Sequence, residues 1–482
     1  MESPLLYSHI PSEEICDEDR AGSLLMCPLC DTDCDLQPLK TSCNYARLTH
    51  MFDNDATVFF AFFMAIWASV FLKLWKRKET KLQYNWGVSA FKQEERLRPE
   101  FKALAVDKNM KEHPVTKVGE REINFFVKTI YFEFFNLFII FLICLVIAAA
   151  IAVIMYEMII VAVLYASDKK TVHQNAKLMT TATASVITLI VITVLNKIYE
   201  HLAKFLTNWE RPRTNTEYNN SITFKMFCFQ FIDFYTPIFY VAFFKGRLGG
   251  WPGHYDYMLG YRMEECEPSG CLTELCIQIA IIMGGDQLKN NFMELLGPKM
   301  NVLYKRWKAK KNKGNRNGIE SGSAKVSRLL KRCEDDFSLE EQPPLGMFEE
   351  YLEMLVQYGF VTIFVAAFPL APLLALLNNI IEIRLDAYKC IALWRRPVAF
   401  RADGIGVWFD ILQSVSVFSV LSNAFIIAWT SDFVPKLVYK LIVSPDMSLT
   451  GYVNHSLSVF DVRDFENYTT TNVDFKDVKF CR

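Results

Sequence analysis

The sequence predicts an all-α polytopic membrane protein with about eight transmembrane helices. Hydrophobic residues make up 52% of the 482 positions and aromatic residues 14%, while 22% are charged. This composition is too apolar for a disordered chain and slightly too apolar for a soluble enzyme. The 52 Lys and Arg residues nearly balance the 53 Asp and Glu residues, which excludes a nucleic-acid-binding protein that relies on bulk positive charge.

Eight apolar stretches are long enough to cross a bilayer, because a transmembrane helix needs about 20 mostly apolar residues. The predicted spans are residues 56–75, 134–156, 178–196, 224–244, 272–296, 350–368, 370–393 and 407–430. The sixth and seventh spans are separated only by Phe368-Pro-Leu-Ala-Pro372. This turn is so short that the two helices must form an antiparallel hairpin.

Clusters of Lys and Arg orient the predicted spans. They follow the first, fifth and seventh spans at residues 76–78, 305–313 and 395–401, and such clusters stay on the cytosolic side. The predicted bundle covers residues 56–430, with cytosolic loops at 76–133, 197–223, 299–348 and 394–406. Residues 1–55, a Cys-rich loop, and residues 431–482 are then extracellular.

The predicted outer segments hold eight of the 13 cysteines, an even number that favours disulfide bonds in an oxidising compartment. The candidates are Cys16, Cys27, Cys30, Cys34, Cys43, Cys266, Cys271 and Cys481. Cys27 and Cys30 could instead form half of a zinc site, but no second pair lies nearby, so we favour disulfides.

Two sequons, at Asn454 and Asn467, also fall on the predicted outer side and predict N-glycosylation. An oxidising outer compartment fits either the cell surface or the lumen of the endoplasmic reticulum. We expect the plasma membrane, with the endoplasmic reticulum as the alternative.

Carboxylates gather at one depth of the predicted hairpin. Glu353 lies 17 residues before its middle at Leu370, and Asp386 lies 16 residues after it. At about 1.5 Å per residue, both lie about 25 Å below the outer turn, close to the inner edge of the hydrocarbon. Glu350 and Glu382 lie about one turn from that level, and each pair shares one helix face.

The fifth span ends at the same level with Asn290 and Glu294, again on one face. Like charges in a low dielectric must protonate or bind a cation. Arg384 faces away from its acidic neighbours on the helix and is a poor counter-ion. Oxygen ligands without His or Cys favour Ca²⁺ over zinc, and over Mg²⁺, which keeps its waters. The predicted metal ligands are Asn290, Glu294, Glu350, Glu353, Glu382 and Asp386.

The alternative is that these acids are solvated side chains at helix ends. That interpretation suits Glu350 and Glu353, since acids are favourable near a helix N-terminus. It does not suit Glu294, Glu382 and Asp386, which lie near helix C-termini, so we favour the metal site.

Gly284 and Gly285 interrupt the fifth span a few residues before Asn290. Paired glycines in a membrane helix can be a close-packing site or a hinge. A hinge beside a metal ligand would let the end of that helix move towards a bound cation and act as a gate. Both interpretations stay open.

Polar residues at helical spacing in the third and fourth spans are candidates to line a hydrophilic pathway. They are Thr181, Ser185, Thr188, Gln230 and Asp233. Hydrogen bonds to their own backbone are the usual explanation for Ser and Thr at such positions. No P-loop, G-x-S-x-G or H-E-x-x-H motif occurs, so the sequence does not predict an enzyme.

Several motifs resemble the anoctamin family of calcium-activated chloride channels and phospholipid scramblases, from about Cys27 onward. They are Tyr235-Thr-Pro-Ile-Phe-Tyr-Val-Ala-Phe-Phe-Lys-Gly246, Cys271-Leu-Thr-Glu-Leu275, Asn290-Asn-Phe-Met-Glu294, Phe368-Pro-Leu-Ala-Pro372, Asn378-Asn-Ile-Ile-Glu-Ile-Arg-Leu-Asp386, Arg395-Arg-Pro397 and Thr430-Ser-Asp-Phe-Val-Pro435. The resemblance implies that the six predicted metal ligands bind calcium from the cytosol. Calcium would then pull the lower part of the fifth span inward and open a membrane-facing groove for chloride, other anions or lipid headgroups.

The resemblance also implies that the eight spans correspond to family helices two to nine, so that the chain is truncated at both ends. The family forms homodimers through its tenth helix, which leaves dimerisation of this chain open. We expect a calcium-activated chloride channel. The alternatives are a calcium-activated phospholipid scramblase and a non-conducting membrane tether or regulatory isoform.

Overall fold

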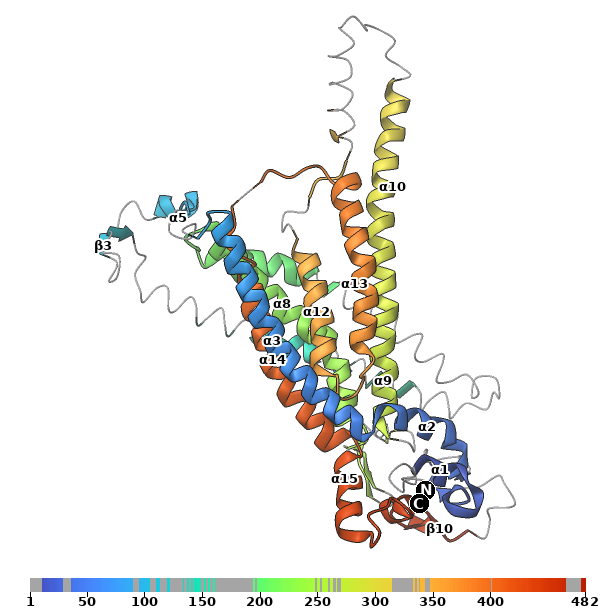
Figure 1. The fold of residues 1–482 in the computed structure, drawn as a ribbon. Helices are drawn as coiled ribbons and strands as arrows, with labels where there is room; N and C mark the ends of the chain where they lie inside the picture. Colours follow the sequence, from blue (N-terminus) through green and yellow to red (C-terminus); the bar gives the residue numbers. More distant parts are fainter. Residues whose placement is uncertain are drawn as a thin grey trace, which may run out of the picture.

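A computed structural model describes residues 11–28, 36–89, 95–104, 197–247, 270–313, 347–399, 401–464 and 478–482, with shorter stretches between 110 and 195, between 249 and 266, and between 333 and 342. The described part is a bundle of long helices with a small domain at one end (Figure 1). The paired strands are all short and form two-stranded sheets.

The bundle helices are α3 (Asp55–Asn85), α8 (Asn215–Phe239), α9 (Cys271–Ile281), α10 (Gln287–Lys313), α12 (Phe348–Ile363), α13 (Ala371–Tyr388) and α14 (Val407–Phe425). Several continue into a π-helical turn: η4 (Tyr240–Phe244) after α8, η5 (Ile282–Asp286) between α9 and α10, η6 (Lys389–Leu393) after α13 and η7 (Ile426–Thr430) after α14. Three of these segments, Leu39–Asn85, Asn215–Phe244 and Val407–Thr430, are long and apolar enough to cross a membrane.

Helices cover six of the eight predicted spans, but their ends differ from the prediction. The first span lies within α3, and the fifth runs through η5 into α10, so helix continues to Asn85 and to Lys313 where we expected loops. The predicted spans 134–156 and 178–196 lie largely outside the described residues.

Helix α12 ends at Ile363, five residues before the predicted end of its span. The cause is Asn423 on α14, whose side chain replaces the helical hydrogen bonds there. Its amide nitrogen donates to the carbonyl of Thr362 at 2.6 Å, and its oxygen accepts from the backbone N–H of Ala366 at 3.0 Å. The wide turn that follows leads into α13, which starts with Pro372 in its first turn, where proline is well tolerated.

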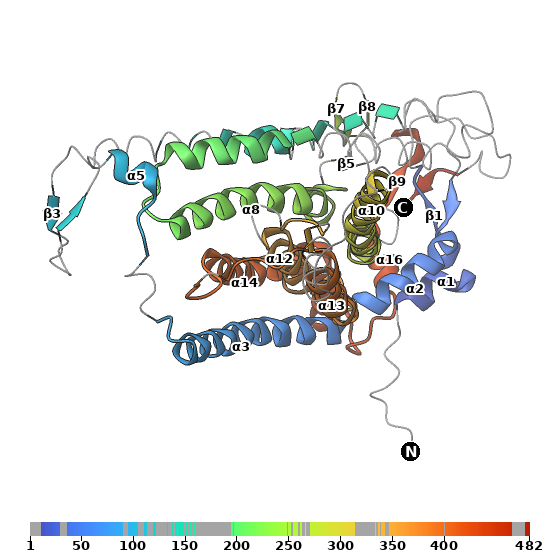
Figure 2. The same cartoon turned by 90° about the horizontal axis from the view of Figure 1, so that it is seen from above.

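Helix α12 lies at the centre of the bundle, packed against α3, α8, α13 and α14 (Figure 2). Its C-terminal half, from Gln357 to Ile363, is almost completely buried, as expected for a mostly apolar helix at the centre of a bundle. At its middle, Gly359 faces Tyr235 of α8, which is 1% exposed and whose hydroxyl donates to the carbonyl of Val356 at 2.8 Å. A Cβ atom at position 359 would lie 2.0 Å from that hydroxyl.

We therefore expect Gly359→Ala to destabilise the bundle by about 1–3 kcal/mol, since the tyrosine ring is buried and hydrogen-bonded and cannot move aside without a loss of packing. The measurement is the melting temperature of the purified protein in detergent. Gly297→Ala on α10 is the control, because nothing lies within 4 Å of a Cβ there. Equal melting temperatures for the two variants would contradict the close contact.

The domain at the end of the bundle joins both ends of the chain. Its first part contains α1 (Pro11–Cys16), η1 (Glu18–Gly22), β1 (Leu25–Met26), β2 (Gln37–Pro38), η2 (Leu39–Ser42) and α2 (Cys43–Phe52). Its second part contains α15 (Phe433–Val438), η8 (Tyr439–Val443), α16 (Tyr452–Ser456), β9 (Phe460–Asp461), η9 (Val462–Asp464) and β10 (Phe480–Cys481). Outside this domain lie α5 (Pro99–Leu104) and the strands β3 (Met110–Glu112), β4 (Gly119–Arg121), β5 (Gly250–Trp251), β6 (His254–Tyr255), β7 (Tyr257–Met258) and β8 (Tyr261–Arg262).

Among the residues that the structure describes, three disulfides link predicted cysteines: Cys16–Cys43, Cys27–Cys481 and Cys266–Cys271. Cys27 is thus bonded to a residue 454 positions away rather than paired with Cys30 in a metal site. Backbone hydrogen bonds support this connection, because the N–H of Cys27 donates to the carbonyl of Arg482 at 3.0 Å. Cys30 and Cys34 lie outside the described residues. Of the two sequons, Asn454 lies exposed on α16, and Asn467 lies outside the described residues.

Candidate metal centre

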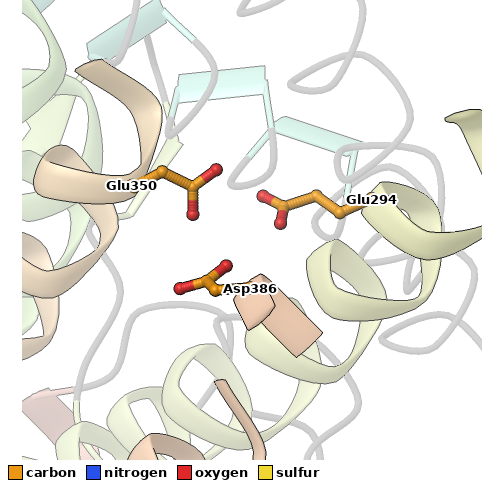
Figure 3. A group of neighbouring side chains, drawn as sticks. All are labelled: Glu294, Glu350 and Asp386. Carbon is orange, nitrogen blue, oxygen red and sulfur yellow. The ribbon is translucent and has the colours of Figure 1, made fainter. Parts of the chain in front are cut away.

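Three helices bring carboxylates together at the end of the bundle opposite the disulfide-bonded domain. Glu294 comes from α10, Glu350 from the first turn of α12 and Asp386 from the last turn of α13. Each offers one oxygen, and the three oxygens lie within 4.8 Å of one another. Figure 3 shows the three carboxylates pointing towards one another. All three side chains are half-buried.

Two further predicted ligands lie beside these three. Glu382, one turn before Asp386, is 2% exposed, and its Oε1 atom has no hydrogen-bond partner among the described residues. Glu353, one turn after Glu350, accepts a hydrogen bond from Gln287 at the start of α10. The structure therefore brings the oxygens of Glu294, Glu350 and Asp386 within 4.8 Å of one another, while Glu353 and Glu382 lie one helical turn from Glu350 and Asp386. Asn290 lies on α10, but its side chain is outside what the structure describes.

This arrangement fits a calcium ion on two physical grounds. Calcium binds oxygens at 2.3–2.6 Å, so two ligands of one ion lie at most about 5 Å apart, and the three oxygens of Glu294, Glu350 and Asp386 meet that limit. A buried carboxylate oxygen without a hydrogen bond, such as that of Glu382, costs free energy that a cation would recover. The donors are carboxylates, which suits calcium rather than zinc.

A basic side chain that was not predicted from the sequence, that of Lys389, lies among the three carboxylates. The ammonium of Lys389 lies 2.8 Å from Glu294, 2.5 Å from Glu350 and 3.1 Å from Asp386. The sequence does carry a signal for it, because Lys389 follows Asp386 by three residues and so lies on the same helix face. Arg384, two residues before Asp386, is exposed.

The comparison with known proteins identifies the family. The model of the family described as "Anoctamin: Calcium-activated chloride channel" matches residues 21–479. This chain belongs to the anoctamin family. Anoctamin-4 of Mus musculus is 44% identical over 98% of the chain and 50% of its own length. Anoctamin-5 and anoctamin-1 of Homo sapiens are 43% and 42% identical over 98% of the chain, and each is covered over 51% of its length. The chain thus spans about half the length of these curated relatives.

A network of side-chain amides connects the three ligand-bearing helices of this anoctamin chain. Asn291 of α10 donates to Asn378 of α13 at 3.2 Å, and Asn378 donates to Gln357 of α12 at 2.9 Å. Gln357 in turn donates to Asn379 at 2.8 Å. Buried side-chain amides are stable only where each donor and acceptor meets a partner, which requires the helices to be aligned with one another. These hydrogen bonds therefore connect α10, α12 and α13 about one to two helical turns away from the carboxylates. Sequence reasoning did not find it, because its members are single polar residues on three separate helices.

The glycine pair lies in the π-helical turn η5 that joins α9 to α10. Nothing lies within 4 Å of a Cβ built at Gly284, and the nearest contact at Gly285 is a side-chain methyl of Ile281 at 3.9 Å. Close helix packing therefore does not explain either glycine in the described structure. π-Helical turns often lie at functional sites and at bends of helices.

The predicted pathway residues are described only in part. Gln230 and Asp233 lie half-buried on α8, whereas Thr181, Ser185 and Thr188 lie outside the described residues. The pathway therefore stays a prediction.

Proposed function

We propose that this anoctamin chain forms a chloride channel that is opened by cytosolic calcium bound between α10, α12 and α13. The observation that carries the proposal is the convergence of the Glu294, Glu350 and Asp386 oxygens within 4.8 Å, from three different helices. A divalent cation there bridges the helices, so calcium binding changes the free energy of any rearrangement that moves one helix relative to the others.

The position of the cluster supports calcium entry from the cytosol. The disulfide-bonded domain lies at one end of the bundle (Figure 1). Phe52 of this domain contacts Phe368 in the turn between α12 and α13, and Glu350 and Asp386 lie at the ends of these helices away from that turn. Disulfides form in an oxidising compartment, which supports an outer location for that end of the bundle. We therefore assign loops 76–133, 197–223, 299–348 and 394–406 to the cytosol and segments 1–55 and 431–482 to the outer side. The plasma membrane is the proposed location.

The gating movement that we propose takes place at η5. When the carboxylates of Glu294, Glu350 and Asp386 hold calcium in place of a protein cation, α10 would turn about Gly284 and Gly285 while α9 stays in place. This movement opens a hydrophilic path past Gln230 and Asp233 on α8. The only chemistry that the ion supplies is positive charge between the carboxylates.

The glycine pair provides a direct test of this hinge. Replacing both Gly284 and Gly285 by Ala stiffens the helix without a steric clash, so we expect calcium binding to change little and calcium-activated flux to fall several-fold. Calcium binding to the purified protein and anion flux into vesicles are measured in parallel. Gly297→Ala, in the same helix, is the control. Full flux in the double variant would exclude a hinge at this position.

Reconstitution tests the function itself. The purified chain is placed in phospholipid vesicles, and anion flux and translocation of a labelled phospholipid are measured with and without micromolar calcium. We expect calcium-dependent anion flux. Calcium-dependent lipid translocation without anion flux would assign the chain to the scramblases instead. No response in either assay would favour a membrane tether or regulatory role. Partners other than anions and phospholipids, and an enzymatic activity, are not part of the proposal.

A further inference from the structure

The position of Lys389 suggests a role in the calcium centre that the ligands alone do not explain. Lys389 is the first residue of η6, directly after α13, and its side chain is 5% exposed. Its ammonium contacts one carboxylate from each of the three helices, at 2.5–3.1 Å. These are the same three carboxylates, of Glu294, Glu350 and Asp386, whose oxygens lie within 4.8 Å of one another.

The ammonium therefore takes the place that a cation bound to these three oxygens would need. Its distances from the oxygens are only slightly longer than the 2.3–2.6 Å of a calcium–oxygen bond. Two cations cannot share this space, since their repulsion at a few ångströms in a partly buried site is large. The ammonium also lies 5.3 Å from the centre of the Trp394 ring, a distance at which a cation is attracted to the ring.

We propose that Lys389 is a tethered counter-cation that occupies the calcium centre in the absence of calcium, and that calcium must displace its ammonium in order to bind. This inference rests on the proposed calcium function of the same cluster. Without calcium, the ammonium offsets part of the repulsion among five carboxylates and keeps the ends of α10, α12 and α13 together. When calcium binds, the ammonium keeps its contact with the Trp394 ring and leaves the carboxylates to the ion.

The consequence is a calcium affinity lower than the carboxylates by themselves would give. Each calcium ion that binds must break three ion pairs as it forms its own contacts, so the free energy of binding is reduced by their loss. The lysine thereby sets the calcium concentration at which the site fills.

Direct measurement of calcium binding tests the proposal without relying on flux. Isothermal titration of the purified full chain in detergent is carried out for the unchanged protein, Lys389→Gln and Lys389→Met. We expect the dissociation constant for calcium to fall roughly tenfold in both variants. Arg384→Gln removes the same charge from an exposed position five residues earlier, and we expect its dissociation constant to change by less than about twofold.

Stability without calcium is the second readout. Loss of the ammonium leaves the carboxylates to repel one another, so both Lys389 variants should melt at a lower temperature in chelator and gain more from added calcium than the unchanged protein. A variant that folds only in calcium also supports the proposal, because the ion then replaces the ammonium. A variant that fails to fold even in calcium contradicts it, as does calcium binding that is unchanged or weaker in both variants.

The design separates this inference from the proposed function. If Glu350→Gln weakens calcium binding while the Lys389 variants do not strengthen it, the calcium centre stands and only the role of Lys389 fails. If Glu350→Gln leaves calcium binding unchanged, the carboxylates are not the calcium centre, and both proposals fail.

Discussion

A Glu350→Gln variant is expected to require roughly tenfold to a hundredfold more calcium than the unchanged protein, both for binding and for activation of flux. Glu350 supplies one of the three oxygens that lie within 4.8 Å of one another. The amide that replaces it has nearly the same shape but cannot carry a negative charge, so the site loses one anionic ligand. Calcium titration of the purified protein and of reconstituted vesicles measures the shift.

The chain offers a closely matched control for this variant. Glu349 is the neighbouring residue in the same helical turn, and its side chain is exposed. Glu349→Gln makes the same chemical change at nearly the same depth, and we expect it to shift the calcium requirement by less than about twofold. If the two variants behave alike, the effect belongs to the general surface potential, and Glu350 is not a ligand.

The second large effect is expected when the disulfide between the two ends of the chain is removed. Replacing Cys27 and Cys481 by Ala opens a loop of 454 residues, and the entropy that a cross-link removes from the unfolded chain grows with loop length. The expected loss is about 5 kcal/mol, the upper end of the usual range. A lower melting temperature in detergent and faster proteolysis of the domain around β1 and β10 are the measurements.

The Cys16–Cys43 disulfide is the control for loop length. It closes a separation of 27 residues within one part of the same domain, so its removal is expected to cost about 3 kcal/mol. If its loss lowers the melting temperature as much as the loss of Cys27–Cys481, loop length does not govern the effect. Local packing around each disulfide would then be the cause.

The carboxylate cluster of Glu294, Glu350 and Asp386 shows how far sequence reasoning reaches. The hairpin turn at residues 368–372 and the rise of an α-helix predicted that Glu353, Asp386 and their neighbours lie at one depth, and the oxygens of Glu294, Glu350 and Asp386 do lie within 4.8 Å of one another. This inference succeeds because the rise per residue and the face of a helix are properties of the backbone, the same in every helix. Residues three or four apart meet whatever the rest of the protein does.

Helix ends were less predictable. The sequence alone does not show that Asn423 of α14 ends α12 at Ile363, because the capping side chain lies 60 positions away in the chain. The extension of helix beyond the fifth span, to Lys313, was missed for a different reason. A hydropathy pattern marks where apolar residues stop, and a helix can continue into charged residues that favour helix formation.

By itself, the sequence determined the apolar helices, the depth and spacing of the acids and the membership of the family, since these depend on local periodicity and on the order of residues. Only the tertiary structure decided that Cys27 joins Cys481, that Asn291, Gln357 and Asn378 form one network, and that the ammonium of Lys389 stands among the carboxylates. The physical reason is that contacts between helices depend on how whole faces pack, and a sequence pattern specifies each face without its partner.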